Sequence, residues 1–239
     1  MTLHGTRVVV LGGTAGIGLA TARAAAAAGA EVVVASSRKT RVEQALADLP
    51  AGTQGHAVDL TDEAAIESLF AQVGPFDHLV YTAGDPLMLG QLQTLDLDAM
   101  RAGLDVRVWG ALTAAKHARP HLRPGASITL TTGAAGRRPT AGWTVVATSC
   151  GALESLTRAL AVELAPIRVN AVMAGMVKTD LWAPIAGPAA AGLYEQTGRS
   201  LPVGRVGEPE DLAAAYLYLM GNGFSTGAII EVDGGNVLV

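Results

Sequence analysis

The 239-residue chain contains one cysteine, few aromatic residues and few charged ones. The single cysteine, Cys150, excludes an internal disulfide framework and is typical of a reducing compartment. Charged residues make up 16% of the chain and hydrophobic residues 50%, a balance that excludes extensive disorder. The net charge is −4 and no block of basic residues occurs, which argues against nucleic acid as the main partner.

Segments that would place the chain in or across a membrane are also not expected. No uninterrupted apolar run reaches the roughly 18–20 residues that span a bilayer, and no signal-peptide pattern precedes the first predicted strand. The histidines do not combine with cysteine or acidic residues at metal-ligand spacing, so no metal site is expected. We therefore expect a soluble, cytoplasmic protein in which residues 1–239 form one large domain.

A glycine-rich turn near the start of the chain suggests a nucleotide site. Arg7–Leu11 predicts a short buried strand, and a helix-forming run covers 19–28. Between them, Gly12 permits a sharp turn, Gly16 lets a pyrophosphate approach the backbone, and Gly18 lets the helix pack closely on the strand. The order of strand, glycine turn and helix start exposes free N–H donors to an anion. A tight turn without a ligand is the alternative reading.

The residues after the second predicted strand, 31–35, favour a phosphorylated dinucleotide. An NAD site usually carries an acidic residue at this strand end, which binds the ribose 2′-hydroxyl. Ser36, Ser37, Arg38 and Lys39 stand there instead and suit a 2′-phosphate. We therefore expect NADP(H) rather than NAD(H), and a solvated loop is the alternative. Predicted strands at 56–60 and 77–82 continue an alternation with helices that indicates a parallel sheet covered on both faces.

A series of motifs in this order resembles the short-chain dehydrogenase/reductase family over nearly the whole chain. The matching segments are Gly12-xxx-Gly16-Ile-Gly18, Asp59-Leu60, Tyr81-Thr-Ala83-Gly84 (the family writes Asn-Asn-Ala-Gly), 153–170, Ala174-Gly-Met-Val-Lys-Thr179, 201–213 and 226–235. The resemblance implies an α/β fold, a Rossmann-like doubly wound sheet of seven parallel strands with helices on both faces, in a single domain. It also implies that residues 176–205 form a substrate-loop region.

The same resemblance implies a set of cofactor and partner contacts. The nicotinamide cofactor would be contacted by Gly12, Thr14, Gly16, Ile17, Gly18, Ser37, Arg38, Asp59, Leu60, Ala83, Gly84 and Thr179. The family binds small-molecule substrates and commonly forms homodimers or homotetramers through two long helices, which fall here at about 97–122 and 142–164.

The positions of the family's catalytic residues are all altered. The usual tetrad is an asparagine, a serine that polarises the carbonyl, a tyrosine that transfers the proton and a lysine four residues later. Counting from the flanking motifs places Arg107, Gly133, Val146 and Cys150 at these positions, and no Tyr-xxx-Lys occurs. Because valine carries no proton and glycine no side-chain donor, the ordinary proton transfer between alcohol and carbonyl has lost its groups.

Arg107 and Thr132 are the remaining catalytic candidates. Arg107 lies in a mostly apolar segment, where it either polarises a carbonyl or clamps a substrate carboxylate, or else reaches the surface or pairs with an acid. Thr132 precedes the altered serine position. Cys150 is read as a small buried hydrophobic residue, with a thiol facing the cofactor ribose as the alternative.

Two functions follow from this pattern. The favoured one is an NADP(H)-dependent oxidoreductase with a rearranged active site, acting on a small carbonyl, imine or enone substrate and weakly on ordinary ketones. The alternative is a catalytically silent NADP(H)-binding protein that acts as a sensor, scaffold or partner subunit, as the loss at all four tetrad positions suggests. A structural protein without a cofactor would leave the glycine turn and Ser37-Arg38 unexplained.

Overall fold

The computed structural model describes residues 2–239 and contains one sheet of seven strands in the order β3-β2-β1-β4-β5-β6-β7. Each neighbouring pair is parallel. The strands are β1 (Arg7–Leu11), β2 (Glu31–Ser36), β3 (Gln54–Ala57), β4 (Phe76–Tyr81), β5 (Leu122–Gly133), β6 (Arg168–Ala174) and β7 (Ile229–Val232). The predicted seven-stranded parallel sheet is therefore confirmed. The strand order reverses between β1 and β4, the point where open α/β sheets bind ligands at the strands' carboxyl ends.

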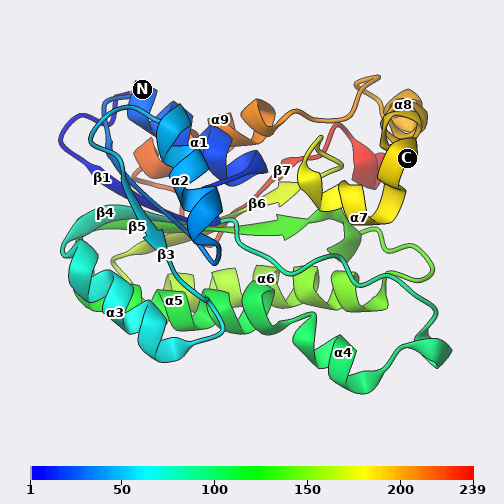
Figure 1. Ribbon diagram of the computed structural model, residues 1–239, viewed down its shortest axis with the longest axis horizontal. Coiled ribbons are helices and arrows are strands. Elements are labelled where there is room, and N and C mark those ends of the chain that lie inside the picture. The colour runs from blue at the N-terminus through cyan, green and yellow to red at the C-terminus, as the bar shows by residue number, and fades with distance from the viewer. Residues whose placement is uncertain (1) are drawn as a thin grey trace.

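Helices cover both faces of the sheet (Figure 1). The helices are α1 (Gly16–Ala27), α2 (Lys39–Asp48), α3 (Glu63–Val73), α4 (Leu97–Ala102), α5 (Ala111–Ala118), α6 (Thr144–Glu163), α7 (Ala183–Ala186), α8 (Ala190–Ser200) and α9 (Pro209–Gly221). One core lies between the sheet and α3, α5 and α6, and the other between the sheet and α1, α2 and α9. In Figure 1, α4 on one side and α7 and α8 on the other project past the end of the sheet.

The strands form a buried sheet because their sequences are nearly continuous apolar runs. Val8, Val9, Val10 and Leu11 of β1 are all fully buried. Successive side chains of a strand point to opposite faces, so these residues supply both cores. This rigid centre fixes the turns at the carboxyl ends of the strands, where the predicted site lies.

Several element boundaries differ from the sequence predictions. Helix α1 begins at Gly16, three residues earlier than predicted, so the last two glycines of the turn belong to its first turn. Strand β3 ends at Ala57, which leaves Asp59 and Leu60 in the following connection. The helix predicted at about 97–122 is interrupted: α4 is followed by a π-helical turn (Asp105–Gly110) and then by α5, and β5 begins at Leu122.

Helix α6 is long and apolar enough, by length and composition, to cross a membrane. The search for uninterrupted apolar runs missed it because polar residues such as Glu154 and Arg158 punctuate the helix. In the structure α6 packs on β5 and β6, and Leu153 and Leu160 lie in the core. A core helix passes the same test of length and composition, and this packing explains its apolar character.

Candidate functional site

The glycine turn between β1 and α1 is a position where side chains cannot be accommodated. Gly12 has φ +86°, and a Cβ there would lie 2.5 Å from the backbone nitrogen of Ala83 at the end of β4. A Cβ on Gly18 would lie 2.2 Å from the carbonyl oxygen of Gly12. Only glycine fits either place, because both atoms in contact are backbone atoms that cannot move aside. The turn therefore brings the start of α1 against the ends of β1 and β4.

The first turn of α1 leaves its N–H donors available to an anion. The residue before the helix, Ala15, makes no side-chain cap, and no acidic side chain lies in the first turn. Four N–H groups at a helix start have no partner within the helix, and their partial positive charge attracts anions. A hollow of about 360 Å³ opens beside this turn and is lined by Thr14, Ala15, Gly16, Leu19, Ala20, Arg23, Lys178, Thr179, Asp180, Pro209 and Glu210.

Thr179 closes one side of this hollow. Gly16 has φ +49°, and a Cβ on it would lie 3.0 Å from Cγ2 of Thr179. The hydroxyl of Tyr194 in α8 donates to the carbonyl oxygen of Thr179 at 3.2 Å. The segment that follows β6 is thereby held against the glycine turn. The two predicted cofactor residues Gly16 and Thr179, far apart in the sequence, are brought together by the fold.

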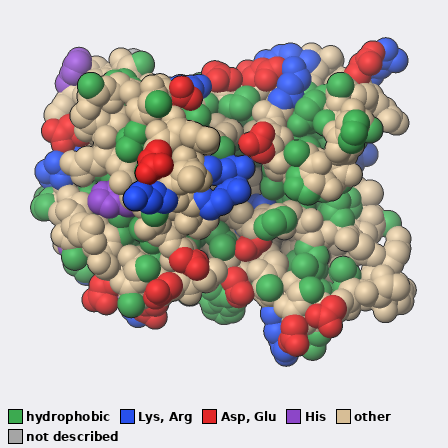
Figure 2. Space-filling view, in the orientation of Figure 1, with side chains coloured by type: hydrophobic (Ala, Val, Ile, Leu, Met, Phe, Trp, Pro, Cys, Tyr) green, Lys and Arg blue, Asp and Glu red, His purple; other side chains and the backbone are tan. Residues whose placement is uncertain are grey.

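The residues predicted for the 2′-phosphate lie at the end of β2, outside the lining of this hollow. Ser37 and Arg38 follow β2 and are exposed to solvent. Beyond them Arg41 of α2 forms an ion pair with Asp180 at 3.8 Å, a contact that the sequence does not suggest. The charged side chains on the face shown in Figure 2 are of both signs and interspersed.

The residues predicted for the adenine lie after β3. Asp59 is exposed, and its Oδ1 accepts hydrogen bonds from the backbone N–H and the hydroxyl of Thr61. These bonds lower the pKa of Asp59. Leu60 is buried at 6% exposure. The backbone of this connection is thus fixed, with one charged and one apolar residue at the predicted place.

Together these features fit a dinucleotide. The turn at Gly12 and Gly18 is shaped by backbone contacts that leave no room for Cβ atoms, and the α1 donors are uncapped. A hollow flanks this turn, and two exposed polar residues follow β2. The residue types, and their placement at the carboxyl ends of parallel strands, are those that a dinucleotide site requires.

The π-helical turn at Asp105–Gly110 is fixed from the end of β4. The Tyr81 hydroxyl donates to the carbonyl oxygen of Val106 at 2.5 Å, and Tyr81 is 2% exposed. Burial raises the pKa of Tyr81, which keeps the hydroxyl protonated. Asp85 Oδ2 accepts from the backbone N–H groups of Val106 and Arg107, at 3.0 and 3.2 Å. The guanidinium of Arg107 lies directly over Gly84, where a Cβ would come within 2.7 Å of Cζ.

Arg107 differs from the other partly buried arginines in its partners. Its Nη2 donates to the carbonyl oxygen of Asp85 at 2.5 Å, and within residues 2–239 it makes no ion pair. The other four each have a carboxylate or two carbonyl acceptors: Arg7 with Glu31, Arg41 with Asp180, Arg123 with Asp77, and Arg168 with the carbonyls of Leu219 and Met220. Burial lowers the pKa of Arg107, while nearby Cys150, Asp85 and Tyr81 act in the opposite direction.

The other three altered tetrad positions form an apolar contact. Val146 and Cys150 lie on the buried side of α6, at 8% and 7% exposure. A Cβ on Gly133 would lie 3.2 Å from the Cys150 sulfur, and one on Gly136 2.8 Å from the Cys150 Cβ. The thiol therefore packs against the turn after β5. Its burial is as expected for the small hydrophobic role that the sequence favours, and a thiol facing the cofactor ribose stays the alternative prediction.

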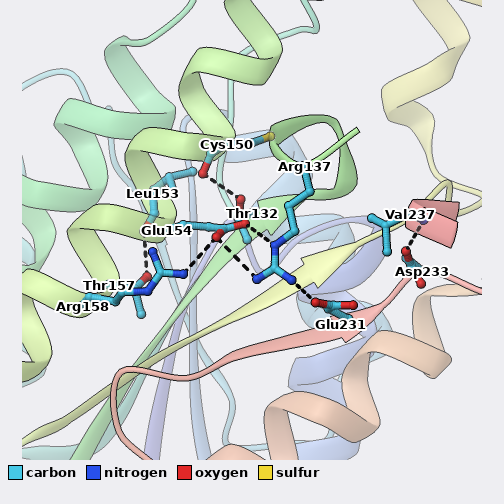
Figure 3. A network of polar contacts seen from close by, with 10 residues as sticks. All are labelled: Thr132, Arg137, Cys150, Leu153, Glu154, Thr157, Arg158, Glu231, Asp233 and Val237. Atoms are coloured by element: carbon cyan, nitrogen blue, oxygen red, sulfur yellow. Dashed lines mark hydrogen bonds and ion pairs between the residues drawn. The ribbon is translucent and has the colours of Figure 1, made fainter. Parts of the chain in front are cut away.

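The hydroxyl of Thr132 is used to hold α6. It is buried at 5% exposure and donates to the carbonyl oxygen of Cys150 at 3.0 Å, as Figure 3 shows. Because the Thr132 hydroxyl already donates its one hydrogen to the helix backbone, it has none to donate to a substrate. Of the two catalytic candidates, Arg107 alone keeps unused donors in the described chain.

An ion network behind α6 was not foreseen from the sequence (Figure 3). Arg137, in the turn after β5, pairs with Glu154 of α6 at 3.1 Å and with Glu231 of β7. Glu154 also pairs with Arg158 at 3.1 Å. Only the four-residue spacing of Glu154 and Arg158 is visible in the sequence. The network ties the turn that contacts Cys150 to two neighbouring elements, so it supports the shape of the site.

Two tryptophans link α6 to the substrate-loop region. Trp143 precedes α6, and Trp182 lies in a short turn (Asp180–Trp182) after Thr179. Their ring centroids are 6.1 Å apart with the planes tilted by 42°. The described residues contain no group of three His, Cys, Asp or Glu side chains placed to hold a metal ion.

Comparisons with known proteins agree with this geometry. Residues 12–236 match the family model described as enoyl-(acyl carrier protein) reductase. The chain is 38% identical to short-chain dehydrogenase/reductase ATR9 of Stachybotrys chlorohalonatus, over 99% of each chain. It is similar to the structure of MalC reductase/Diels-Alderase from Malbranchea aurantiaca (TM-score 0.92, 31% identity, 99% and 98% covered). It also resembles a crystal structure of a small-chain dehydrogenase in complex with NADPH (TM-score 0.83, 36% identity, 98% and 99% covered).

Proposed function

Because the chain belongs to the short-chain dehydrogenase/reductase family of oxidoreductases, we propose that it is an NADP(H)-dependent reductase whose substrate needs no proton from the protein. Members of this family bind a nicotinamide cofactor, and one similar structure holds NADPH. The substrate we expect is a small, largely apolar enone, whose enolate takes its proton from water, or an imine that is already protonated as an iminium ion. The observation that carries the proposal is a partly buried Arg107 with unused donors beside altered tetrad positions.

The proposed cofactor contacts come from four connections. The start of α1 would bind the pyrophosphate, Ser37 and Arg38 the 2′-phosphate, Asp59 and Leu60 the adenine, and Thr179 the nicotinamide side. The remaining contacts are the backbone and side chains of Gly12, Thr14, Gly16, Ile17, Gly18, Ala83 and Gly84. When bound, NADPH supplies the hydride, so the protein must supply orientation and charge stabilisation.

Arg107 supplies the charge stabilisation in this proposal. Its free N–H groups would donate to an oxygen of the substrate, such as an enone carbonyl that gains negative charge during reduction. Val146 and Gly133 offer no donor at the tyrosine and serine positions. An alkoxide would therefore form without a nearby acid, which disfavours ordinary ketones. An iminium ion becomes a neutral amine on accepting a hydride and needs no proton, so the missing acid does not slow its reduction.

Thr132 contributes indirectly. Since its hydroxyl holds the backbone at Cys150, we expect it to position α6 rather than to polarise the substrate. Residues 176–205 would cover the substrate, and the contact between Trp143 and Trp182 would place that cover against α6. We further propose that the protein is a cytoplasmic homodimer or homotetramer. It would assemble through α6 and through the arm formed by α4, the π-helical turn and α5 (residues 97–118).

A second function deserves a direct test because all four tetrad positions are altered. A silent protein of this fold would bind NADP(H) as a sensor, scaffold or partner subunit. It would keep the glycine turn and the Ser37-Arg38 pair and would need no group aimed at a substrate. The unused donors of Arg107 favour the reductase, since a silent protein has no use for a desolvated guanidinium whose N–H groups are mostly without acceptors.

The test is a titration with NADPH and with NADH, followed by a substrate panel. NADPH should bind more tightly than NADH in a fluorescence titration. The NADPH complex is then mixed with cyclic imines, iminium salts, enones and simple ketones. Oxidation of NADPH by an imine or enone, with little by the ketones, would support the reductase. Tight binding without oxidation favours the silent protein, and fast reduction of simple ketones would contradict the assigned tetrad positions.

A further inference from the structure

Asp85 contacts Arg107 at two separate places. Its carboxylate accepts from the backbone N–H groups of Val106 and Arg107, and its main-chain carbonyl accepts from Nη2 of the Arg107 side chain. The two residues are 22 positions apart in the sequence. One residue in the connection after β4 therefore fixes both the backbone and the guanidinium of Arg107.

The Asp85 carboxylate acts as an N-terminal cap of the π-helical turn, although it comes from another segment of the chain. At the start of a helical turn the first N–H groups have no acceptor within the helix. Here the intrahelical bonds begin with the N–H groups of Val108 and Trp109, both of which donate to the carbonyl oxygen of Leu104. Asp85 accepts from the two N–H groups just before them. A carboxylate at this place also faces the positive end of the helical segment, which stabilises the turn.

This use of the carboxylate leaves the guanidinium without an ionic partner. Oδ2 of Asp85 is engaged by two backbone donors, and no ion pair between Asp85 and Arg107 forms. Among residues 2–239 the guanidinium donates a hydrogen bond only to the neutral carbonyl oxygen of Asp85, so its remaining N–H groups keep their capacity for a stronger acceptor. A direct ion pair would have held the arginine equally well but would have occupied those donors.

We propose that Asp85 is the positioning residue for Arg107 and that together they form a binding site for a carboxylate or carbonyl oxygen of the substrate. The Tyr81 hydroxyl holds the carbonyl of Val106 on the same turn and so limits its motion further. The flat backbone of Gly84 gives the guanidinium a surface to lie on. This inference rests on the proposed function, because the oxygen it binds belongs to the reductase substrate.

The test uses benzoate as a carboxylate probe of the protein–NADP⁺ complex. We expect the Arg107→Leu variant to bind benzoate about tenfold more weakly, because one charge-assisted hydrogen bond is lost. Asp85→Ala should weaken benzoate binding by a similar factor, and the double variant should be no weaker than Arg107→Leu alone. Asp85→Asn keeps an acceptor oxygen and should lose less, roughly two- to fivefold. Asp98→Ala, which removes an exposed ion pair with Arg101 on the same arm, is the matched control.

Two further measurements distinguish a positioning role of Asp85 from a general loss of structure in the variants. NADPH affinity should be unchanged within about twofold in the Asp85 variants, while amide hydrogen exchange at 106–107 becomes faster. If Asp85→Ala does not fold, the Asp85→Asn variant carries the comparison. Equal benzoate affinity in all variants, or additive losses in the double variant, would overturn the inference. Failure of the wild-type protein to bind NADPH would instead overturn the proposed function.

Discussion

Partly buried polar groups differ in their partners between the two ends of the strands. We call the end where the parallel strands begin the amino edge of the sheet and the end where they finish the carboxyl edge. Toward the amino ends of the strands three such groups have protein partners: His78 with Ser127 at 2.9 Å, the half-exposed Arg123 with Asp77 at 2.8 Å, and Arg168 with two carbonyls of α9; the buried Thr129 hydroxyl of β5 has none among residues 2–239. At the carboxyl edge Arg107 and the first turn of α1 keep donors without protein partners.

Unused donors in a partly buried place cost free energy, so a fold retains them where a ligand completes them. The comparison teaches that the functional edge of this protein can be recognised by what its polar groups lack. We therefore propose that the amino edge mainly stabilises the fold and that the carboxyl edge binds the ligand. The predictions below test that division, from the largest expected effect to the smallest.

The largest effect is expected from Gly18→Ala. Its Cβ would meet the carbonyl oxygen of Gly12 at 2.2 Å and Oγ1 of Thr82 at 2.4 Å. We expect the free energy of unfolding to fall by roughly 4 kcal/mol and NADPH binding to be lost. Urea denaturation measures the first and fluorescence titration the second. Gly151→Ala in α6 is the control, because nothing lies within 4 Å of its Cβ, and it should stabilise by about 0.5–1 kcal/mol. Equal stability of the two variants would contradict the close approach at this turn.

Acid should weaken the amino edge through His78. Burial lowers the pKa of His78 from 6.5 to about 4, with nearby Arg168 acting in the same direction and Asp77 opposing it. The unfolded chain then binds this proton more readily than the folded protein does. The free energy of unfolding should therefore fall between pH 6.5 and pH 4, by about 3 kcal/mol.

Denaturant midpoints over this pH range measure the loss. The His78→Gln variant should show a flatter dependence between pH 6.5 and pH 4.5, and His4→Gln, at an exposed residue, should keep the wild-type slope. Identical slopes in the wild-type and His78→Gln proteins would remove His78 as the cause of the loss.

A smaller effect, confined to one cofactor, is expected from Arg38→Ala at the carboxyl edge. Loss of a charge-assisted hydrogen bond to the 2′-phosphate should weaken NADPH binding about tenfold and leave NADH binding unchanged. Arg119→Ala removes an exposed arginine near the amino edge and should change neither affinity. Titration of each variant with both nucleotides gives the ratio. An equal loss for NADPH and NADH would show that Arg38 does not read the 2′-phosphate.

The smallest effect is expected from Cys150→Ala. Because the thiol packs against Gly133 and Gly136, its removal leaves a small cavity that costs about 1 kcal/mol of stability. Turnover with the best substrate of the panel should change by less than about twofold, since no step of the proposed reaction uses the sulfur. A loss of turnover by a factor of ten or more would restore Cys150 to the reacting groups.

The sequence predicts the carboxyl edge better than it predicts the contacts that hold it. The glycine turn, the sheet and the order of elements follow from local patterns, because the close contacts at Gly12 and Gly18 leave room for no other residue. The π-helical turn was missed, since the carboxylate that accepts from the N–H group of Val106 belongs to Asp85, 21 positions earlier in the chain. The Arg137–Glu231 contact joins residues 94 apart. Side chains that meet only through the folded sheet leave no periodic trace in the chain.

The paired indoles also give the protein a built-in optical reporter. The chain has three tryptophans, and Trp143 and Trp182 lie 6.1 Å apart across the join between α6 and the substrate-loop region. The third, Trp109, is largely exposed on the π-helical turn. At such a separation two indoles couple electronically, so the near-ultraviolet circular dichroism should carry a signal from the closed arrangement. Any movement of residues 176–205, the segment proposed to cover the substrate, would be visible in that spectrum without a label.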